Sequence, residues 1–332
     1  MSLAVTVVGI VGWLIIGYWL LSHLWSFFRQ RQQLQLQDRW VVVTGCDSGI
    51  GAGVMNQLTA DGASVIAFCF TEQGAAAALA AGAKLAPRLD ITDSEAVAKA
   101  CNEVNALCGG RLWGLAHIAG FAQPGFIEFQ SMDNFRKTME VNFFAIADIT
   151  QRLLNSVKAC SGRVVIVTSV DGIVSLPGNA PYDASKFAAE AYADALRAEL
   201  SFWQVQVAVI NPSTLRTPLA MEFFEAATVT WEDMERRDPD GEWKQSWPRE
   251  WLQHYVRKNK KGLESIAQDP QCAVDDICHA LAAVRPKIRY LSGTAAKTVF
   301  YALWVMPEHW SLAAKKATIS PAPNTDRIAA VK

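Results

Sequence analysis

Short apolar runs alternate with helical stretches through most of this chain, and this alternation constrains the fold more than any other feature. The apolar runs, rich in Val and Ile, are 40–45, 64–70, 114–120, 163–169 and 205–212. The helical stretches between them include 51–61, 94–107, 132–157 and 183–201. Continuous apolar runs of this kind indicate parallel strands covered on both faces. The sequence therefore predicts a doubly wound, Rossmann-type α/β fold, whose ligands bind at the carboxyl ends of the strands.

The N-terminus departs from this pattern, because residues 3–28 contain no Asp, Glu, Lys or Arg. About 20 apolar residues suffice to cross the hydrocarbon layer of a membrane. A cleaved signal peptide would have a basic start, a shorter apolar core and a small-residue cleavage site. The segment lacks these features and ends in bulky aromatic residues, so we predict an N-terminal transmembrane helix over 1–28, followed by a polar stalk over 29–38.

Arginine residues follow the apolar segment, at positions 29, 31 and 39, and none precedes it. The positive-inside bias then puts the body of the protein in the cytosol. We expect a single-pass protein of the endoplasmic reticulum membrane, with the lipid bilayer as a partner. A composition of 51% hydrophobic and 19% charged residues agrees with this expectation, and a net charge of −1 offers no broad basic face for nucleic acid.

The rest of the chain is expected to be one Rossmann domain over 39–315, with a disordered tail over 316–332. Residues 219–265 interleave four tryptophans with dense charge, and we interpret them as a helical insertion that acts as a substrate lid. They could instead be a surface excursion whose tryptophans pack downward. The aromatic segment 294–310 either lies on the bilayer surface or is a packed core helix.

A glycine-rich loop, "TGCDSGIG" at 44–51, follows the first predicted strand and precedes a helix. Backbone N–H groups at a helix N-terminus bind anions, and glycine lets a pyrophosphate approach the backbone closely. The spacing differs from the G-x-G-x-x-G of many Rossmann proteins, but its place in the first βα unit predicts a dinucleotide site. The expected members are Thr44, Gly45, Asp47, Ser48, Gly49, Ile50 and Gly51.

Two other segments are expected to complete the dinucleotide site. Ala119 and Gly120 end the third strand, where a larger side chain would collide with a ribose. Asp90 and Ile91 end another short apolar element, and the carboxylate of Asp90 would accept a hydrogen bond from the adenine amino group. An N-cap of the next helix is an equally good interpretation of Asp90.

The sequence favours NAD over NADP by exclusion. NADP selection needs a cation near the ribose 2′-phosphate, and neither the glycine loop nor residues 67–74 supply one. The usual acidic partner of the NAD ribose is missing as well, since Cys69 stands near its place. The seven cysteines and five histidines show no metal-ligand spacing, so we expect no metal.

The stretch "YDASK" at 182–186 places Tyr182 and Lys186 on one face of a helix, at positions i and i+4. A phenol is a poor base at neutral pH, but a neighbouring ammonium group lowers its pKa. We therefore expect Tyr182 to exchange a proton with an alcohol or a carbonyl, Ser169 to hold the substrate oxygen, and Lys186 also to bind the ribose of the cofactor.

These motifs together resemble those of short-chain dehydrogenases/reductases, over residues 38–310. "TGCDSG" at 44–49, together with Ser169, Tyr182, Ser185 and Lys186, is similar to the membrane-anchored branch of retinol dehydrogenases and 17β- or 11β-hydroxysteroid dehydrogenases. The resemblance implies that Asn142 is a fourth catalytic residue, supporting a water that relays protons from Lys186. It also implies that Pro212 and Thr217 border the nicotinamide, with Thr217 binding the carboxamide.

The chain departs from the family pattern at two places. His117 and Ile118 replace two amides that brace the central strands, which could loosen the sheet near the adenosine site. Ser213 replaces a glycine after Pro212, which would put a side chain beside the nicotinamide.

The leading hypothesis is an NAD-dependent dehydrogenase that interconverts an alcohol and a carbonyl on an apolar substrate, a steroid or retinoid by resemblance. The alternatives are a non-catalytic membrane-bound scaffold or sensor that binds a dinucleotide, and a carbonyl reductase that uses NADPH. A stripe of small residues on the catalytic helix either admits a partner helix in a homodimer or packs in the core: Ala184, Ala188, Ala191 and Ala195.

Overall fold

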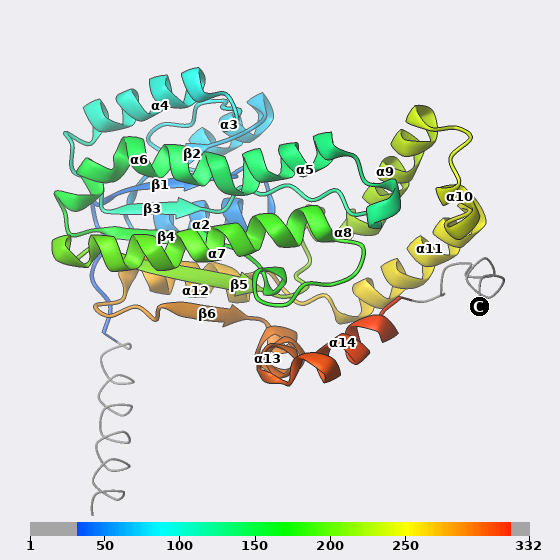
Figure 1. Ribbon diagram of the computed structural model, residues 1–332. Coiled ribbons are helices and arrows are strands. Elements are labelled where there is room, and N and C mark those ends of the chain that lie inside the picture. Colours follow the sequence, from blue (N-terminus) through cyan, green and yellow to red (C-terminus); the bar gives the residue numbers. More distant parts are fainter. Residues whose placement is uncertain (1–31, 320–332) are drawn as a thin grey trace, which may run out of the picture.

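A computed structural model describes residues 32–319, in which the strands form a six-stranded, entirely parallel sheet (Figure 1). The strand order is β2-β1-β3-β4-β5-β6, with crossovers on both sides of β1. The predicted doubly wound parallel sheet is confirmed, and β6 is an additional strand. The strands are β1 (Trp40–Thr44), β2 (Ser64–Phe68), β3 (Gly114–His117), β4 (Arg163–Val167), β5 (Gln206–Pro212) and β6 (Arg289–Ser292).

Helices connect the strands and cover both faces of the sheet (Figure 1). Those that precede the insertion are α2 (Gly49–Ala60), α3 (Glu72–Ala80), α4 (Ser94–Leu107), α5 (Met132–Met139), α6 (Ala145–Lys158) and α7 (Ala180–Leu200). The later ones are α8 (Pro218–Met221), α9 (Phe223–Arg237), α10 (Trp243–Ser246), α11 (Arg249–Ile266), α12 (Gln271–Ala282), α13 (Tyr301–Val305) and α14 (Glu308–Ala317). Short 3₁₀ and π turns are η1 (Ile127–Phe129), η2 (Glu140–Phe144), η3 (Val170–Gly172), η4 (Ser201–Trp203) and η5 (Ala296–Phe300).

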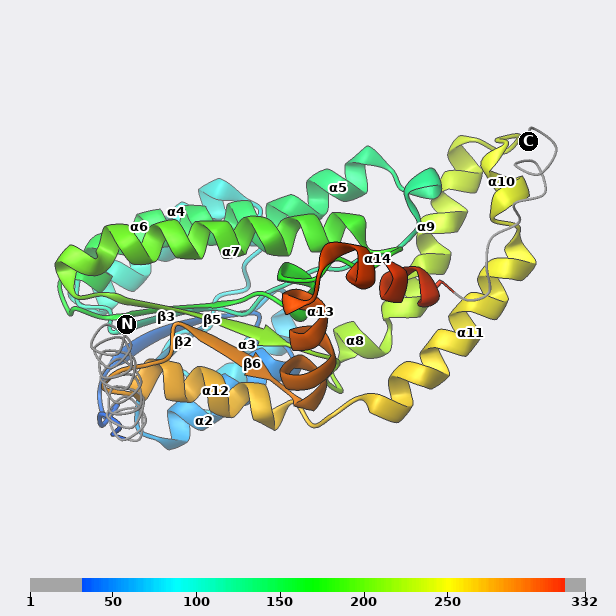
Figure 2. The ribbon, with the colours of Figure 1, turned by 60° about the horizontal axis from the view of Figure 1, so that its bottom comes forward.

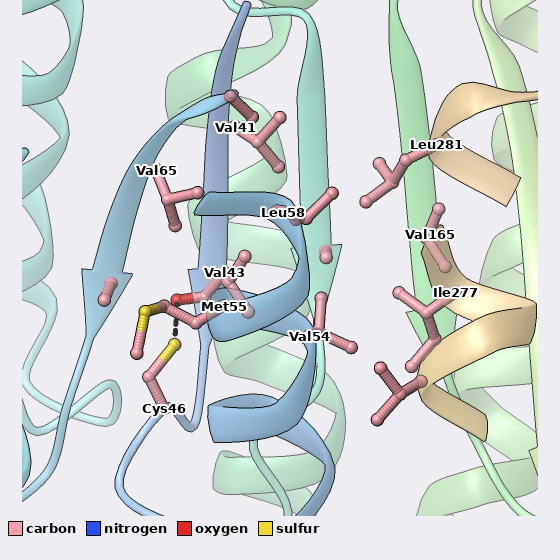
Figure 3. Packing of buried hydrophobic residues seen from close by; sticks show 14 of the residues in the cluster. Val41, Val43, Cys46, Val54, Met55, Leu58, Val65, Val165, Ile277 and Leu281 are labelled. Atoms are coloured by element: carbon pink, nitrogen blue, oxygen red, sulfur yellow. Dashed lines mark hydrogen bonds between the residues drawn. The ribbon is translucent and has the colours of Figure 1, made fainter. Parts of the chain in front are cut away.

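The central strand β1 shows why its residues form a strand that is buried on both faces. Val41 and Val43 belong to a core shared with α2 and α12, whereas Val42 belongs to a second core shared with α4, α6 and α7. All three side chains are fully buried, and burial of a side chain of this size contributes about 1.5–3 kcal/mol. Figure 3 shows the first core, where Leu58 of α2 packs toward the valines of β1.

The insertion at 219–265 is helical, as predicted, and consists mostly of α8–α11, which lie beyond the carboxyl ends of the strands (Figures 1 and 2). Its four tryptophans, at 231, 243, 247 and 251, are buried in a third core together with Phe126 and Phe129. The ring of Phe126 stacks on Trp247, with 4.3 Å between centroids. The insertion therefore packs on residues 121–130, the loop that follows β3.

The described chain begins beside the end of α12 and ends at Ile319, which packs against the third core. Leu34 N donates to Ala282 O at 2.7 Å and Leu36 is buried, so the described part of the predicted stalk packs on the domain. Among residues 32–319, no helix has the length and apolar character needed to cross a bilayer. The anchor predicted over 1–28 lies outside the described residues, as do residues 320–332 of the predicted tail.

Candidate active site

The glycine loop between β1 and α2 packs so tightly that Gly45 and Gly51 have no room for a side chain. Gly45 has a φ of +76°, and a Cβ at this position would lie 2.8 Å from Ala119 Cα. A Cβ at Gly51 would lie 2.0 Å from Gly45 O. No side chain caps the N-terminus of the 12-residue helix α2, so its first N–H groups remain available to an anion. These features fit the pyrophosphate of a dinucleotide.

Thr44 joins the glycine loop to the end of β3. Its hydroxyl oxygen accepts hydrogen bonds from the N–H groups of Ile118, at 3.0 Å, and Ala119, at 3.1 Å. His117 is buried and bonds through Nε2 to Thr150 Oγ1 at 2.9 Å; burial lowers the pKa of its ring to about 3. The expected loosening of the sheet at His117 and Ile118 is not seen, because these bonds tie the end of β3 to β1 and to α6.

Asp47 ties the glycine loop to the turn after β2. Its carboxylate accepts hydrogen bonds from the N–H groups of Phe70, at 2.7 Å, and Thr71, at 2.8 Å, and from the Thr71 hydroxyl at 2.6 Å. Asp47 thus holds the loop around the expected adenosine position. Ser48 is exposed at the N-cap of α2, and Ile50 packs against the core.

The turn after β5 meets the glycine loop from the other side. A Cβ at Gly49 would lie 3.4 Å from Thr217 Cβ, and Thr217 caps α8 through a bond from Ala220 N. Pro212 is the buried last residue of β5. The hydroxyl of Ser213, which replaces the family's glycine, donates to Ser292 O in β6 at 3.3 Å. The neighbouring strand therefore holds this side chain.

Asp90 does not cap the next helix, because Asp93 is the N-cap of α4 and accepts bonds from Glu95 N and Ala96 N. The carboxylate of Asp90 instead accepts hydrogen bonds from the N–H and hydroxyl of Thr92, at 3.0 and 2.7 Å. Asp90 is exposed and Ile91 packs partly on the core.

The expected catalytic residues converge at the carboxyl ends of β3 and β4. Ser169 follows β4, and its hydroxyl oxygen accepts a bond of 3.1 Å from Asp171 N. On α7, Lys186 Nζ lies 5.4 Å from the ring centroid of Tyr182 and donates to Val167 O at 3.1 Å. A Cβ at Gly120 would lie 3.6 Å from both Lys186 Nζ and Asn142 Oδ1, so the end of β3 also borders this group.

Asn142 lies in the π-helical turn η2, between α5 and α6. Its amide donates to Phe121 O at 2.8 Å and to Ser185 Oγ at 2.9 Å, and its oxygen accepts from Phe121 N at 2.8 Å. π-turns inside helices are frequent at functional sites. This turn therefore fixes Asn142 between the loop after β3 and the helix that carries Tyr182 and Lys186.

The pKa of Tyr182 is not lowered by Lys186, contrary to the expectation from the sequence. Burial raises the pKa of Tyr182, and the charge of Asp171 raises it further, whereas a hydrogen bond with Ser169 opposes the shift. Burial also lowers the pKa of Lys186 to about 8, against the charges of Glu190 and Asp171. The expectation is wrong for the protein alone, because desolvation outweighs the cation. A positively charged nicotinamide ring beside the phenol would act in the opposite direction.

Sequence reasoning missed several charged groups that the fold brings to the site. Asp171 and Asp183 flank Ser169 and Tyr182 along the chain, and Glu190 lies one turn after Lys186. Glu190 is buried and pairs with Arg289 of β6 at 2.6 Å. Arg88 lies beside Cys69 at the end of β2 through an isolated parallel bridge. Asp183 stands in the quoted YDASK motif, but no local pattern indicates the roles of Asp171, Glu190 or Arg88.

Comparison with known proteins identifies the class. Residues 39–228 match the family model of the short chain dehydrogenases, and this chain belongs to that family. It is 33% identical over 303 residues to 17-beta-hydroxysteroid dehydrogenase type 6 of Bos taurus, covering 89% of this chain and 94% of that protein. It is 34% identical over 303 residues to retinol dehydrogenase 16 of Homo sapiens, with the same coverage. The chain is an NAD(P)-dependent short-chain alcohol dehydrogenase of the retinol and hydroxysteroid dehydrogenase branch.

Solved structures agree with the fold. A short chain dehydrogenase/reductase from Burkholderia phymatum in complex with NAD has a TM-score of 0.67 at 18% identity, and covers 87% of this chain and 99% of its own. A short chain dehydrogenase from Burkholderia cenocepacia in complex with NADP has a TM-score of 0.61 at 22% identity, with coverages of 87% and 100%. The fold therefore accommodates a nicotinamide dinucleotide, and these likenesses do not distinguish NAD from NADP.

Proposed function

We propose that this protein uses NAD to interconvert an alcohol and a carbonyl on an apolar lipid of the steroid or retinoid class, with Tyr182 as acid and base. The observation that carries the proposal is the convergence of Ser169, Tyr182, Lys186 and Asn142 beside the end of β3 and opposite the glycine loop. The relatives named above are retinol and hydroxysteroid dehydrogenases, which favours that substrate class.

In this mechanism each residue has one task. A bound nicotinamide would supply the hydride acceptor for oxidation of the alcohol carbon and the hydride donor for reduction of the carbonyl. Tyr182 takes the hydroxyl proton during oxidation and supplies it during reduction. Ser169 donates a hydrogen bond to the substrate oxygen, which holds it in line with the phenol. Lys186 lies beside the phenol, and its ammonium group together with a bound, positively charged nicotinamide would offset the effect of burial on the phenol. Asn142 orients the segment that carries Lys186 and would support a water that relays the proton.

The choice of NAD rests on charge at the end of β2. A 2′-phosphate placed there would meet the carboxylate of Asp47, which is held by the N–H groups of Phe70 and Thr71. Arg88 is a cation nearby and favours the alternative, an NADPH-dependent reductase, but its Nε lies 4.0 Å from Glu72 Oε1. A pair this exposed contributes little, so the proposed preference for NAD depends on the carboxylate of Asp47.

The insertion is proposed to act as a lid over the substrate. The Trp247 indole N–H donates to a carboxylate oxygen of Glu128, and Thr230 Oγ1 donates to Pro124 O at 2.7 Å. These bonds couple α9 and α10 to the loop after β3, which continues from the Asn142-bonded Phe121. A lid attached in this way would close an apolar pocket over the strand ends.

We also propose two partners, a lipid bilayer and a second copy of the chain. Residues 3–28 are the predicted anchor, and α13, with the sequence YALWV, has no buried residue, which favours the bilayer-surface interpretation of 294–310. On α7, Ala184, Ala191 and Ala195 are exposed together with Phe187. Three of the four alanines of the stripe are thus exposed and the fourth, Ala188, is half-buried, which supports a homodimer through this helix.

The experiment that tests the proposed function is an oxidation screen of steroids, retinoids and fatty alcohols with the purified full chain. NADH formation is followed with NAD, and NADPH formation with NADP. The proposal expects turnover of at least one steroid or retinoid with NAD. Dinucleotide binding without turnover of any alcohol or carbonyl would favour the scaffold or sensor, and turnover with NADP(H) alone would favour the carbonyl reductase.

A further inference from the structure

A carboxyl group lies beside the catalytic hydroxyls, and the mechanism above does not use it. Asp171 is in η3, and its N–H donates to Ser169 Oγ at 3.1 Å. The Ser169 side chain also acts electrostatically on the Asp171 carboxyl group and on Tyr182. The Ser169 hydroxyl therefore lies between a carboxyl group and the phenol that exchanges the proton.

The fold holds this carboxyl group in place. Asn179, which is 4% exposed at the N-cap of α7, donates from Nδ2 to Asp171 Oδ2 at 3.3 Å. The next residue, Gly172, is pressed against α7, since a Cβ there would lie 3.1 Å from Glu190 Cγ and 3.2 Å from Lys186 O. The turn that carries Asp171 is thus fixed on the helix that carries Tyr182 and Lys186.

The charged and titratable groups around Asp171 come from several elements. On α7 they are Tyr182, Asp183, Lys186 and Glu190, and α11 adds Tyr255 near Gly178. Arg289 of β6 pairs with Glu190, and Lys315 of α14 acts on Asp183. The ammonium of Lys186 acts on Asp171 itself.

Asp171 and Tyr182 oppose each other electrostatically. A negative charge on Asp171 raises the pKa of Tyr182 and so disfavours the phenolate. Burial raises the pKa of Asp171, whereas the bonds with Ser169 and Asn179 and the charge of Lys186 lower it. The protonation states of the two groups are therefore coupled through one serine hydroxyl.

We propose that Asp171 is a positioning residue, whose carboxyl group sets the direction of the Ser169 hydrogen bond and with it the pH at which Tyr182 exchanges its proton. This inference rests on the proposed function of Tyr182. An ionised Asp171 accepts the Ser169 O–H, so that Ser169 accepts from the phenol and Tyr182 stays protonated. A protonated Asp171 donates to Ser169 Oγ, and the Ser169 hydroxyl then donates to the substrate oxygen.

The test is the pH profile of kcat/KM for alcohol oxidation in the full chain. Asp171→Asn removes the charge and keeps the shape. Because Tyr182 acts as the base in oxidation, kcat/KM rises with pH as the phenol loses its proton. We expect the midpoint of this rise to move down by about one pH unit when the charge of Asp171 is lost. Asp171→Glu keeps the charge and should keep the wild-type midpoint. The matched control is Asp194→Asn on the exposed face of α7, where Asp194 pairs with Arg197, and it should leave the profile unchanged.

An unchanged midpoint in Asp171→Asn, with unaltered cofactor affinity and Tm, would overturn the inference. If Asp171→Asn does not fold, Asp171→Ser is the uncharged variant to use. The same downward shift of the midpoint is expected for it, and an unchanged midpoint would contradict the inference. The two proposals fail differently. A wild-type protein that oxidises no alcohol contradicts the proposed function and removes the basis of this inference, whereas wild-type turnover without a shift contradicts the role of Asp171 alone.

Discussion

The side-chain amide of Asn142 donates a hydrogen bond of 2.9 Å to the hydroxyl group of Ser185, and this bond joins the π-turn η2 to the catalytic helix α7. The Ser185 hydroxyl donates in turn to Tyr182 O at 2.7 Å. Because Ser185 precedes Lys186, the bond sets the position of the ammonium group and of the phenol together. Asn142 is fully buried, so the groups that it satisfies depend on its amide and not on bulk solvent.

Replacement of this amide should reduce both activity and stability. In Asn142→Ala, the N–H and C=O of Phe121 and the hydroxyl of Ser185 lose their partner, and a buried unsatisfied polar group costs about 1–3 kcal/mol. We expect kcat to fall by at least about tenfold and Tm to fall by several degrees. The control is Asn155→Ala, at an exposed position of α6; an equal effect of the two changes would contradict the role of Asn142.

Dinucleotide binding should depend on the missing side chain at Gly51. In Gly51→Ala the new Cβ would lie 2.0 Å from Gly45 O, so the loop must move away from the close approach that a pyrophosphate needs. We expect at least a tenfold rise in the Kd for NADH, measured by fluorescence titration. Gly262→Ala is the matched control, because Gly262 lies in α11 with open space around its Cβ position and helical Ala is favoured by about 0.5–1 kcal/mol. Wild-type affinity in Gly51→Ala would refute this account of the loop.

Cofactor choice should follow the charges at the end of β2. We expect NAD to bind at least about tenfold more tightly than NADP, because the carboxylate of Asp47 opposes a 2′-phosphate. Calorimetric titration of both cofactors measures this ratio. Arg88→Ala should weaken NADP binding further and leave NAD binding within about twofold. Tighter binding of NADP by the unaltered protein would show that Arg88, and not Asp47, controls the site.

Stability should fall with rising pH because Asp183 is buried. Burial and the charge of Asp171 raise the pKa of Asp183 above its ordinary value of 3.8, and the bond from Leu176 N opposes the shift. A pKa that is raised in the folded state gives stability that is complete below the unfolded value and is lost as pH rises through the folded value. Between about pH 5 and about pH 9 the Tm of the wild type should fall, and the Tm of Asp183→Asn should fall by a few degrees less. Parallel curves for the two proteins in differential scanning calorimetry would contradict this prediction.

Sequence reasoning could predict the sheet because its strands carry the signal locally. The three valines of β1 are consecutive, and consecutive apolar residues in a strand require cover on both faces. The same holds for Tyr182 and Lys186, whose spacing on one helix fixes their common face. The helical insertion was also predictable, since its charge is too dense for a central strand and its four tryptophans are too many for an idle linker.

The remaining features depend on contacts between distant segments. The π-turn at Asn142 forms with partners at 121 and 185, and no local pattern marks it. The sign of the Tyr182 pKa shift depends on burial by the folded chain, which is a property of the packing. Arg88 reaches the end of β2 through a bridge to Cys69. His117 braces the sheet through Thr150 of α6, a partner that its family position does not indicate.

The central claim is that the phenol of Tyr182 transfers the proton while hydride moves to the dinucleotide. Its most direct test is a single-turnover measurement of NADH formation in wild-type protein and in Tyr182→Phe, with an alcohol that the screen identifies. The account predicts that the variant binds NADH with wild-type affinity and forms NADH more slowly by about 10²–10⁴-fold. Formation of NADH at the wild-type rate by Tyr182→Phe would contradict it.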